Sequence, residues 1–171
     1  TQIGYLPNVL VVHPSLPVNN VRALIAYAKN NKGKLSFASS GSGASSHLAG
    51  ELFNMKAGTD IMHVPYKGTG PALNDLVGGQ VSMSFTDVLT ALPFIESGKL
   101  RVLGVTTIKR SRALPNVPTL AEQGLTDFDA SVFFGIVAPA GTPPAVVDKL
   151  NAAFVKVVQD PAVKERLQKQ G

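Results

Sequence analysis

The residues best suited to chemistry in this sequence stand together in one short turn, between an apolar pair and a helical run. After Phe37 and Ala38 the chain reads SSGSGASS, and it continues as HLAGELF. The turn comprises Ser39, Ser40, Gly41, Ser42, Gly43, Ala44, Ser45 and Ser46. Serine and glycine at this density are typical of three kinds of site: a nucleotide cradle, a serine nucleophile with a nearby histidine, and a turn whose backbone amides bind an anion.

The dinucleotide fingerprint is incomplete in this turn. Residues 41–46 read G-x-G-x-x-S, so the third glycine, which allows close packing of helix on strand, is missing. Asp60 lies 19 residues after Gly41, but it precedes the apolar segment 61–64, whereas the fingerprint places its acidic residue at the far end of a strand. No G-K-[ST] sequence follows the turn, which excludes a P-loop. We therefore expect no nucleotide cofactor.

A serine hydrolase also lacks its sequence signature here. The nucleophile elbow has the form G-x-S-x-G, whereas Ser42 has glycines directly on both sides. Ser42 or Ser45 acting with a histidine stays open as an alternative, because only the fold decides which base lies near either hydroxyl. The three histidines, His13, His47 and His63, show no short ligand spacing, so no metal site is predicted.

An anion-binding turn requires fewer specific residues than a dinucleotide site or a serine hydrolase. A strand, a Gly/Ser turn and a helix start leave free backbone N–H groups and a partial positive charge at one point. Glycines let a ligand approach the backbone closely, and serine hydroxyls add donors. No Asp or Glu lies between Ser36 and Gly50, so nothing in this stretch repels a carboxylate. An ordinary turn followed by a helix with an N-cap serine explains the same residues, and this alternative stays open.

The elements around the turn alternate between strands and helices. Short apolar runs predict strands, and stripes at helical spacing separate them. The predicted strands cover residues 9–12, 35–38, 61–64, 81–85, 100–107 and 133–137. Helices are predicted after Asn20, from Ser45 to a C-cap at Gly58, after Pro71, after Thr86 or Asp87, over Thr119–Gln123 and through the tail. This alternation predicts an α/β fold with a mainly parallel sheet flanked by helices.

Other residues that follow strands are candidates for the same site, because ligands of open α/β sheets favour the carboxyl ends of strands. Tyr66 lies in the loop after 61–64, and Thr86 and Asp87 follow the strand 81–85. Asp87 is suited either to accept a hydrogen bond from a ligand or to cap the next helix, and both interpretations stay open. Ordinary loop chemistry is an equal alternative for Tyr66.

The two ends of the chain differ from its middle. Residues 14–130 contain the regular alternation of strands and helices. Residues 1–13 supply a strand that enters this unit, and residues 131–171 supply a strand that leaves it, followed by two helices. Two crossing strands are typical of a protein whose lobes are joined by a hinge. We therefore expect one complete lobe over 14–130 and incomplete parts of another lobe at both ends.

Composition narrows the class of protein. The 171 residues are 44% hydrophobic and 16% charged, which indicates a folded domain with a core. The net charge is +5, but the basic residues are spread out and tryptophan is absent, so nucleic-acid binding is not expected. The absence of cysteine excludes disulfides and thiolate metal sites. No apolar run of about 18 residues and no signal peptide is present, so we expect either a cytosolic chain or one whose N-terminus has been removed.

Five segments together resemble one receptor family. They read GKLSFASSGSGASSHLAGELF, HVPYKGTGPALNDLVGGQV, SGKLRVLGVTT, RSRALPNVPTLAEQG and GIVAPAGTPPAVVDKLNAAF. They resemble the Bug family, the TctC-like solute receptors of tripartite tricarboxylate transporters. The resemblance implies a periplasmic receptor of the two-lobed Venus-flytrap type, with the type II periplasmic-binding-protein fold. It implies capture of a small carboxylate or similar solute, delivery to a membrane permease, no catalysed reaction and no cofactor.

The resemblance also assigns roles to residues. The turn Ser39–Ser46 and the start of its helix match the ligand loop of the family's second lobe. Thr86 and Asp87 match a segment that contacts the variable part of the solute, and Tyr66 lies in a further matching loop. The resemblance implies no catalytic residue and no metal ligand.

The match corresponds to the C-terminal portion of the family, so we expect a truncated form. It covers the second lobe, both hinge strands and part of the helices that return to the first lobe. The hinge is expected near Val11–Pro14 and Val132–Ala138. Because the ligand loop of the first lobe has no counterpart here, a rival interpretation is an isolated lobe that forms a homodimer without capturing a ligand.

Overall fold

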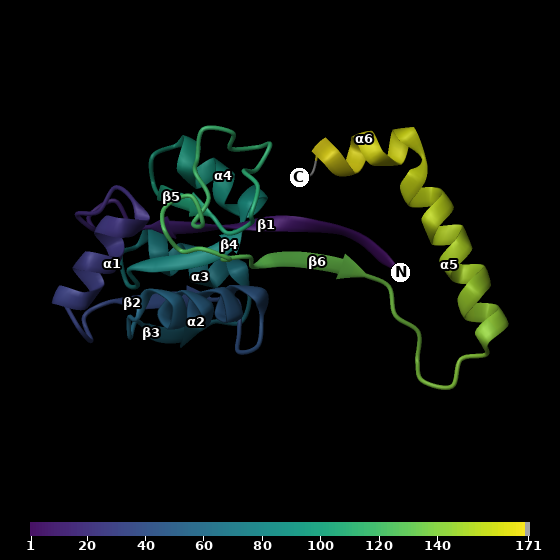
Figure 1. Ribbon diagram of the computed structural model, residues 1–171, viewed down its shortest axis with the longest axis horizontal. Helices are drawn as coiled ribbons and strands as arrows, with labels where there is room; N and C mark the ends of the chain where they lie inside the picture. Colours follow the sequence, from purple (N-terminus) through teal and green to yellow (C-terminus); the bar gives the residue numbers. More distant parts are fainter. Residues whose placement is uncertain (170–171) are drawn as a thin grey trace. The chain divides into compact units, whose positions relative to one another are not determined.

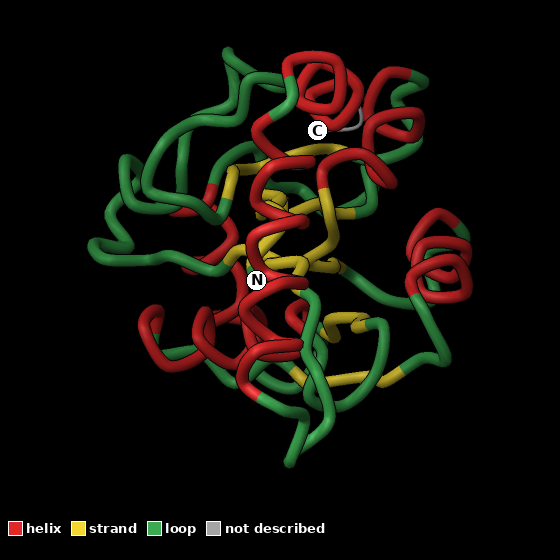
Figure 2. The backbone as a smooth tube through the Cα atoms, turned by 90° about the vertical axis from the view of Figure 1, so that its right-hand side faces the viewer, coloured by secondary structure: helices red, strands yellow, loops and turns green. Residues whose placement is uncertain are grey.

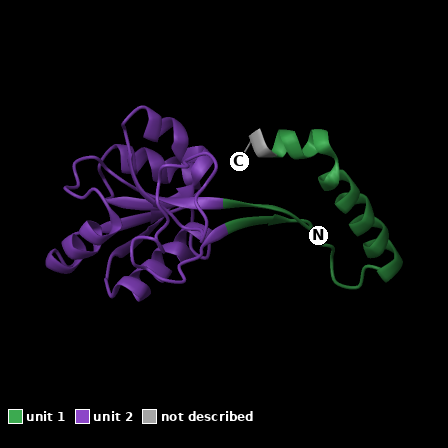
Figure 3. Ribbon diagram, turned by 45° about the horizontal axis from the view of Figure 1, so that its top comes forward, with its two compact units in different colours: residues 1–6, 132–171 green, residues 7–131 purple. Residues whose placement is uncertain are grey.

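The computed structural model describes residues 1–169, and the chain divides into two compact units. The larger unit runs from Pro7 to Ser131, and the smaller one combines residues 1–6 with the chain from Val132 onward (Figure 3). Both changes of unit fall inside strands rather than in loops. How these units correspond to the predicted lobe segments 1–13, 14–130 and 131–171 stays a prediction.

A mixed sheet runs through the larger unit (Figure 1). Its strands are β1 (Gln2–Val12), β2 (Ser36–Ser39), β3 (Met62–Pro65), β4 (Met83–Asp87) and β5 (Arg101–Val105), in the spatial order β3-β2-β4-β1-β5. β2 is parallel to β3 and β4, whereas β1 is antiparallel to β4 and β5. Only β1 among these five runs against the others, so the predicted α/β fold with a mainly parallel sheet is confirmed.

Helices cover both faces of this sheet, as Figure 1 shows. They are α1 (Val21–Asn30), α2 (Ser45–Ala57), α3 (Thr69–Val77) and α4 (Val88–Glu96). Successive residues of β1 reach opposite faces: Leu10 and Val12 pack with α1 and α2, and Val9 and Val11 pack with α3 and α4. All four side chains are fully buried. This period of two is what a strand covered on both faces requires.

Two helix boundaries lie where the sequence predicts them. The side chain of Asn20 caps α1 by accepting a hydrogen bond of 2.8 Å from the Ala23 N–H. Gly58 ends α2 with a φ of 61°, a left-handed conformation that glycine adopts without strain. Both signals act within one turn of the boundary, which is why the sequence alone reveals them.

The helix predicted over Thr119–Gln123 is wrong, because this segment is bonded to β5 instead. The Val105 N–H donates to Pro118 O at 3.0 Å, and the Leu120 N–H donates to Val105 O at 2.9 Å. The connection from β5 to β6 (Ser131–Gly135) is described throughout and contains no helix (Figure 2). Pairing with the sheet therefore outweighs the local helical signal.

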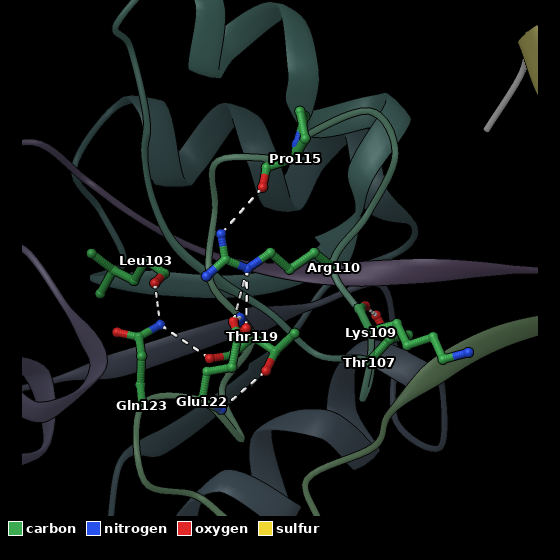
Figure 4. Close-up of polar contacts among 8 residues, drawn as sticks. All are labelled: Leu103, Thr107, Lys109, Arg110, Pro115, Thr119, Glu122 and Gln123. Carbon is green, nitrogen blue, oxygen red and sulfur yellow. Dashed lines mark hydrogen bonds and ion pairs between the residues drawn. The ribbon is translucent and has the colours of Figure 1, made fainter.

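A small polar network fastens this connection to the sheet (Figure 4). Thr119 and Glu122 exchange the two bonds of a capping box around one turn, at 2.7 and 3.0 Å. Arg110 Nε donates to both carboxylate oxygens of Glu122, at 3.0 and 3.1 Å. The Thr119 N–H, then Arg110, hold the pKa of Glu122 below its usual range. Gln123 Nε2 donates to Leu103 O at 2.8 Å, which joins the turn to β5.

The smaller unit consists of β6, the N-terminal residues and two helices, α5 (Pro144–Gln159) and α6 (Pro161–Lys169). Thr1 and Ile136 exchange two backbone hydrogen bonds, of 3.0 and 2.9 Å. The predicted apolar stripe of α5 is present, but its side chains Val146, Val147 and Leu150 are exposed. Over the described residues, every helix falls short of the length and apolar character needed to cross a membrane.

Candidate anion-binding site

The turn Ser39–Ser46 lies at the sheet edge where three parallel strands end. β2, β3 and β4 run in the same direction, so the residues that follow them meet at this edge. The Tyr66 N–H donates to Ser39 O and the Gly68 N–H donates to Ser40 O, both at 3.0 Å. Ser84 Oγ of β4 donates to Ala38 O at 2.9 Å. The loop that contains Tyr66 therefore lies against the turn, whereas Thr86 and Asp87 are the last two residues of β4.

The turn is held by its own serines and by two glycines in conformations that other residues rarely adopt. Gly41 has a φ of 142° and Gly43 a φ of 83°. The buried Ser46 Oγ accepts from the Ser40 N–H at 3.0 Å and lies 3.1 Å from Ser40 Oγ. Ser39 is also buried, whereas Ser42 and Gly43 are exposed. The predicted residues thus divide into those that shape the turn and those that present it to solvent.

Two helices begin at this edge without a side-chain cap. The N-cap residues are Ala44 for α2 and Gly68 for α3, and neither caps its helix through a side chain in the described structure. The first N–H groups of a helix have no partner within the helix, and they carry its partial positive charge. The first turns of α2 and α3 contain no acidic residue. The edge therefore offers backbone donors and positive potential to an anion.

Asp87 caps α4, the third helix that begins at this edge. Its Oδ1 accepts from the Thr90 N–H at 2.8 Å, and both carboxylate oxygens lie 2.7 Å from Thr90 Oγ1. Of the two roles that the sequence leaves open for Asp87, capping is the one with a partner in the described structure.

Replacing Asp87 with alanine should lower the free energy of unfolding by about 1 kcal/mol, because α4 loses its cap. Asp87→Asn should retain most of the stability, since an amide oxygen also caps. Urea denaturation followed by circular dichroism measures both. Asp60→Ala, which removes an exposed aspartate, is the matched control. Equal stability of Asp87→Ala and Asp60→Ala would contradict the capping role.

Two buried oxygen atoms near this edge, Asn8 Oδ1 and Thr86 Oγ1, have no hydrogen-bond partner among the described residues. Asn8 aligns with Asp87 and Val9 with Thr86 in the register of β1 and β4. Buried polar atoms are nearly always bonded, so these two oxygens are exceptions in the part of the chain that the structure describes. Sequence reasoning missed Asn8, although a polar residue at the start of the apolar run 9–12 is a usable signal.

Tyr66 contributes its backbone rather than its hydroxyl to this edge. The hydroxyl donates to Asp75 Oδ2 of α3 at 2.7 Å. Burial, with the hydrogen bond and negative charge of Asp75, raises the pKa of Tyr66 to about 12. The side chain therefore stays protonated and fastens the loop after β3 to α3.

Two histidines contact residues of the turn, an arrangement that the sequence does not predict. His63 Nε2 lies 2.6 Å from Ser39 Oγ, and His47 Nδ1 accepts from the Gly43 N–H at 3.0 Å. The two rings stack with centroids 4.0 Å apart. Burial, then the charge of His47, lowers the pKa of His63, although Glu51 opposes this shift. The histidines are 16 residues apart on different elements, so only the fold brings them together.

These contacts do not assemble a serine hydrolase. The serine that meets a histidine is Ser39, whose exposed fraction is 0%, so a substrate does not reach its hydroxyl. His47 uses Nδ1 to accept from a backbone amide rather than from a serine. Neither Ser42 nor Ser45, the two nucleophiles considered from the sequence, has a histidine as hydrogen-bond partner in the described structure.

Comparison with known families identifies the family of this chain. Residues 1–171 match the family described as the tripartite tricarboxylate transporter family receptor. The chain belongs to this receptor family. The resemblance seen in the sequence is thereby confirmed, and so is the expectation of a receptor rather than an enzyme.

Three known proteins illustrate what this member of the receptor family is similar to. Protein BugT of Bordetella pertussis is 40% identical over 171 residues, which are 100% of this chain and 52% of BugT. The structure of R. palustris Rpa4515 with adipate has a TM-score of 0.90 and 36% identity, over 99% of this chain and 57% of that one. The structure of MatC from Rhodopseudomonas palustris with bound malate has a TM-score of 0.86 and 32% identity, over 98% and 57%.

These matches confirm the periplasmic-binding-protein fold for this member of the receptor family. The chain spans about half the length of the curated relatives it matches. The activity, solute and partners of the whole receptor are therefore questions for a proposal.

Proposed function

We propose that the edge formed by the turn Ser39–Ser46 and the starts of α2 and α3 binds a carboxylate group of a small organic solute. The observation that carries this proposal is the meeting of two helix starts that lack side-chain caps and acidic first-turn residues. Two similar proteins, whose structures contain adipate and malate, support a carboxylate as the bound group.

The contacts of each residue suggest its role in the proposed site. Ser39 and Ser46 are buried and hold the turn, while Ser40 joins it to the next loop and Gly41 provides the bend. The exposed residues Ser42 and Gly43 and the first-turn amides of α2, which follow Ala44 and begin at Ser45, face the solute. Thr86 contributes its unpartnered hydroxyl, Asp87 orients the start of α4, and Tyr66 positions the neighbouring loop.

In the whole receptor, we assign the larger unit to the second lobe of a periplasmic two-lobed protein. The smaller unit belongs to the first lobe, and β1 and β6 are the hinge strands, because each changes unit within its length. Membership of a transporter receptor family supports capture of the solute between two lobes and its transfer to membrane permease subunits.

The carboxylate site is tested by replacing Gly43 with valine. Gly43 has a φ of 83° and no atom within 4 Å of an added Cβ, so the substitution strains the backbone of the turn without filling the core. Because displaced amides lose hydrogen bonds to a charged group, we expect carboxylate affinity to fall at least about tenfold. Isothermal titration of the 171-residue chain with mono- and dicarboxylates, adipate and malate included, measures this.

Gly33→Val is the matched control, since Gly33 also has a positive φ, of 73°, and open space around it, but lies in the turn before β2. It should bind like the unmodified chain. The proposal fails if a folded chain binds none of the carboxylates, or if Gly43→Val and Gly33→Val bind them equally well.

A further inference from the structure

Behind the anion-binding turn, the fold gathers three side chains that the proposed carboxylate site does not use. His47 and Glu51 lie one helical turn apart on α2, and His63 lies on β3. One ligand atom from each of the three lies within 4.8 Å of the other two. Glu51 is half exposed, so its carboxylate is free to move toward the rings.

The hydrogen bonds of Ser39 leave one nitrogen of His63 available. Ser39 Oγ has a single proton, which it donates to Gly41 O at 3.2 Å, and it accepts from the Gly41 N–H at the same distance. The contact of 2.6 Å with His63 Nε2 accommodates either tautomer, and in the tautomer that donates through Nε2 the Ser39 proton stays with Gly41 O. Nδ1 of the neutral ring then carries a lone pair. A metal-binding histidine usually donates its other N–H to an oxygen in this way.

His47 carries its lone pair on the opposite nitrogen. Its Nδ1 accepts from the Gly43 N–H at 3.0 Å, so the proton of the neutral ring is on Nε2. Nε2 lies 3.6 Å from Glu51 Oε1. A cation that bridges the imidazole and the carboxylate binds at Nε2 once the proton of the neutral ring has moved to Nδ1.

We propose that His47, Glu51 and His63 bind a divalent transition-metal ion, with Zn²⁺ as the representative. Two imidazoles and one carboxylate form a donor set that suits Zn²⁺, with water completing a tetrahedral shell. Ligand atoms in such a shell lie about 3.3 Å apart, and the rings, which stack with centroids 4.0 Å apart in the unbound chain, have to rotate out of the stack so that both lone pairs point at one ion.

Metal binding at this site changes the anion-binding turn. A metal on His47 Nε2 displaces the proton of that nitrogen, and the neutral ring then carries its proton on Nδ1. An Nδ1–H donates instead of accepting, so the Gly43 N–H loses its acceptor. The ion therefore releases one backbone amide of the turn, which becomes available to a carboxylate.

Titration of the untagged 171-residue chain with Zn²⁺ by calorimetry, in a buffer that does not bind metals, tests the site. We expect saturable binding of one ion per chain. Affinity should fall at least about tenfold in Glu51→Gln and in His63→Gln, because each variant removes one of three ligands. Glu96→Gln and His13→Gln, which remove the same groups elsewhere on the larger unit, should bind Zn²⁺ like the unmodified chain.

The amide resonance of Gly43 in a ¹⁵N spectrum provides a second measurement. It should shift when Zn²⁺ is added, return when a chelator removes the ion, and stay unchanged in Glu51→Gln. Glu51 is exposed enough for this variant to fold even if His63→Gln does not. The proposal is overturned if the unmodified chain shows no saturable binding, or if Glu51→Gln binds Zn²⁺ as tightly as Glu96→Gln.

Discussion

Replacing Phe85 with alanine should lower the free energy of unfolding by about 3–5 kcal/mol. Phe85 lies in β4, and its exposed fraction is 0%. Its ring lies 5.8 Å from that of Phe53 on α2 and 6.3 Å from that of Phe128, measured between centroids. Truncation removes the apolar surface of the ring from the core and leaves a cavity that three elements share. Urea denaturation followed by far-UV circular dichroism measures the loss.

Met55→Ala is the matched control for this substitution. Met55 is a large apolar residue of the same unit, but its side chain is 74% exposed, so we expect a change within about 0.5 kcal/mol. If Phe85→Ala and Met55→Ala unfold at the same urea concentration, β4 does not pack against α2 as described.

Replacing Gly50 with alanine should lower the free energy of unfolding by about 1–3 kcal/mol, although alanine is the better helix former. A Cβ at Gly50 would lie 2.2 Å from Cε2 of Phe37, and Phe37 is a buried residue of β2. Because the ring is enclosed by the core, the helix and the strand have to separate to admit the methyl group. Thermal and urea unfolding of the variant both report this cost.

Gly70→Ala is the matched comparison, because the same substitution at this position should change the free energy of unfolding in the opposite direction. Gly70 lies in α3, and nothing lies within 4 Å of a Cβ added there. Gain of helix propensity should raise the free energy of unfolding by up to about 1 kcal/mol. A stabilising effect of Gly50→Ala would contradict the close approach of α2 to Phe37.

Local signals made much of this fold predictable from the sequence. The caps at Asn20, Gly58 and Asp87 act within one turn of chain, so residue types at short spacing reveal them. The failure at Thr119–Gln123 has a different origin, since hydrogen bonds to Val105 decide the conformation there. Val105 lies 14 residues before Thr119, so the residues within one helical turn of the segment do not include that partner.

The candidate site was predictable in its turn but not in its surroundings. The density of glycine and serine in residues 39–46 marks the turn directly. The unpartnered oxygens of Asn8 and Thr86 depend on the register of two strands, and the stack of His47 on His63 depends on how α2 lies over β3. These relations join residues far apart in the chain, and only tertiary structure specifies them.

The place of β1 in the sheet has a consequence for how the chain folds. Val12 pairs with Met83 and Val9 pairs with Val105, so β1 finds its partners only after most of the larger unit has been made. Contacts between residues so distant in sequence slow folding, because a long loop has to close before they form. Since β1 supplies side chains to the core on both faces of the sheet, neither face can complete its packing before β1 pairs with β4 and β5. The larger unit therefore folds and unfolds cooperatively, and until β1 pairs it is an exposed apolar segment at risk of aggregation.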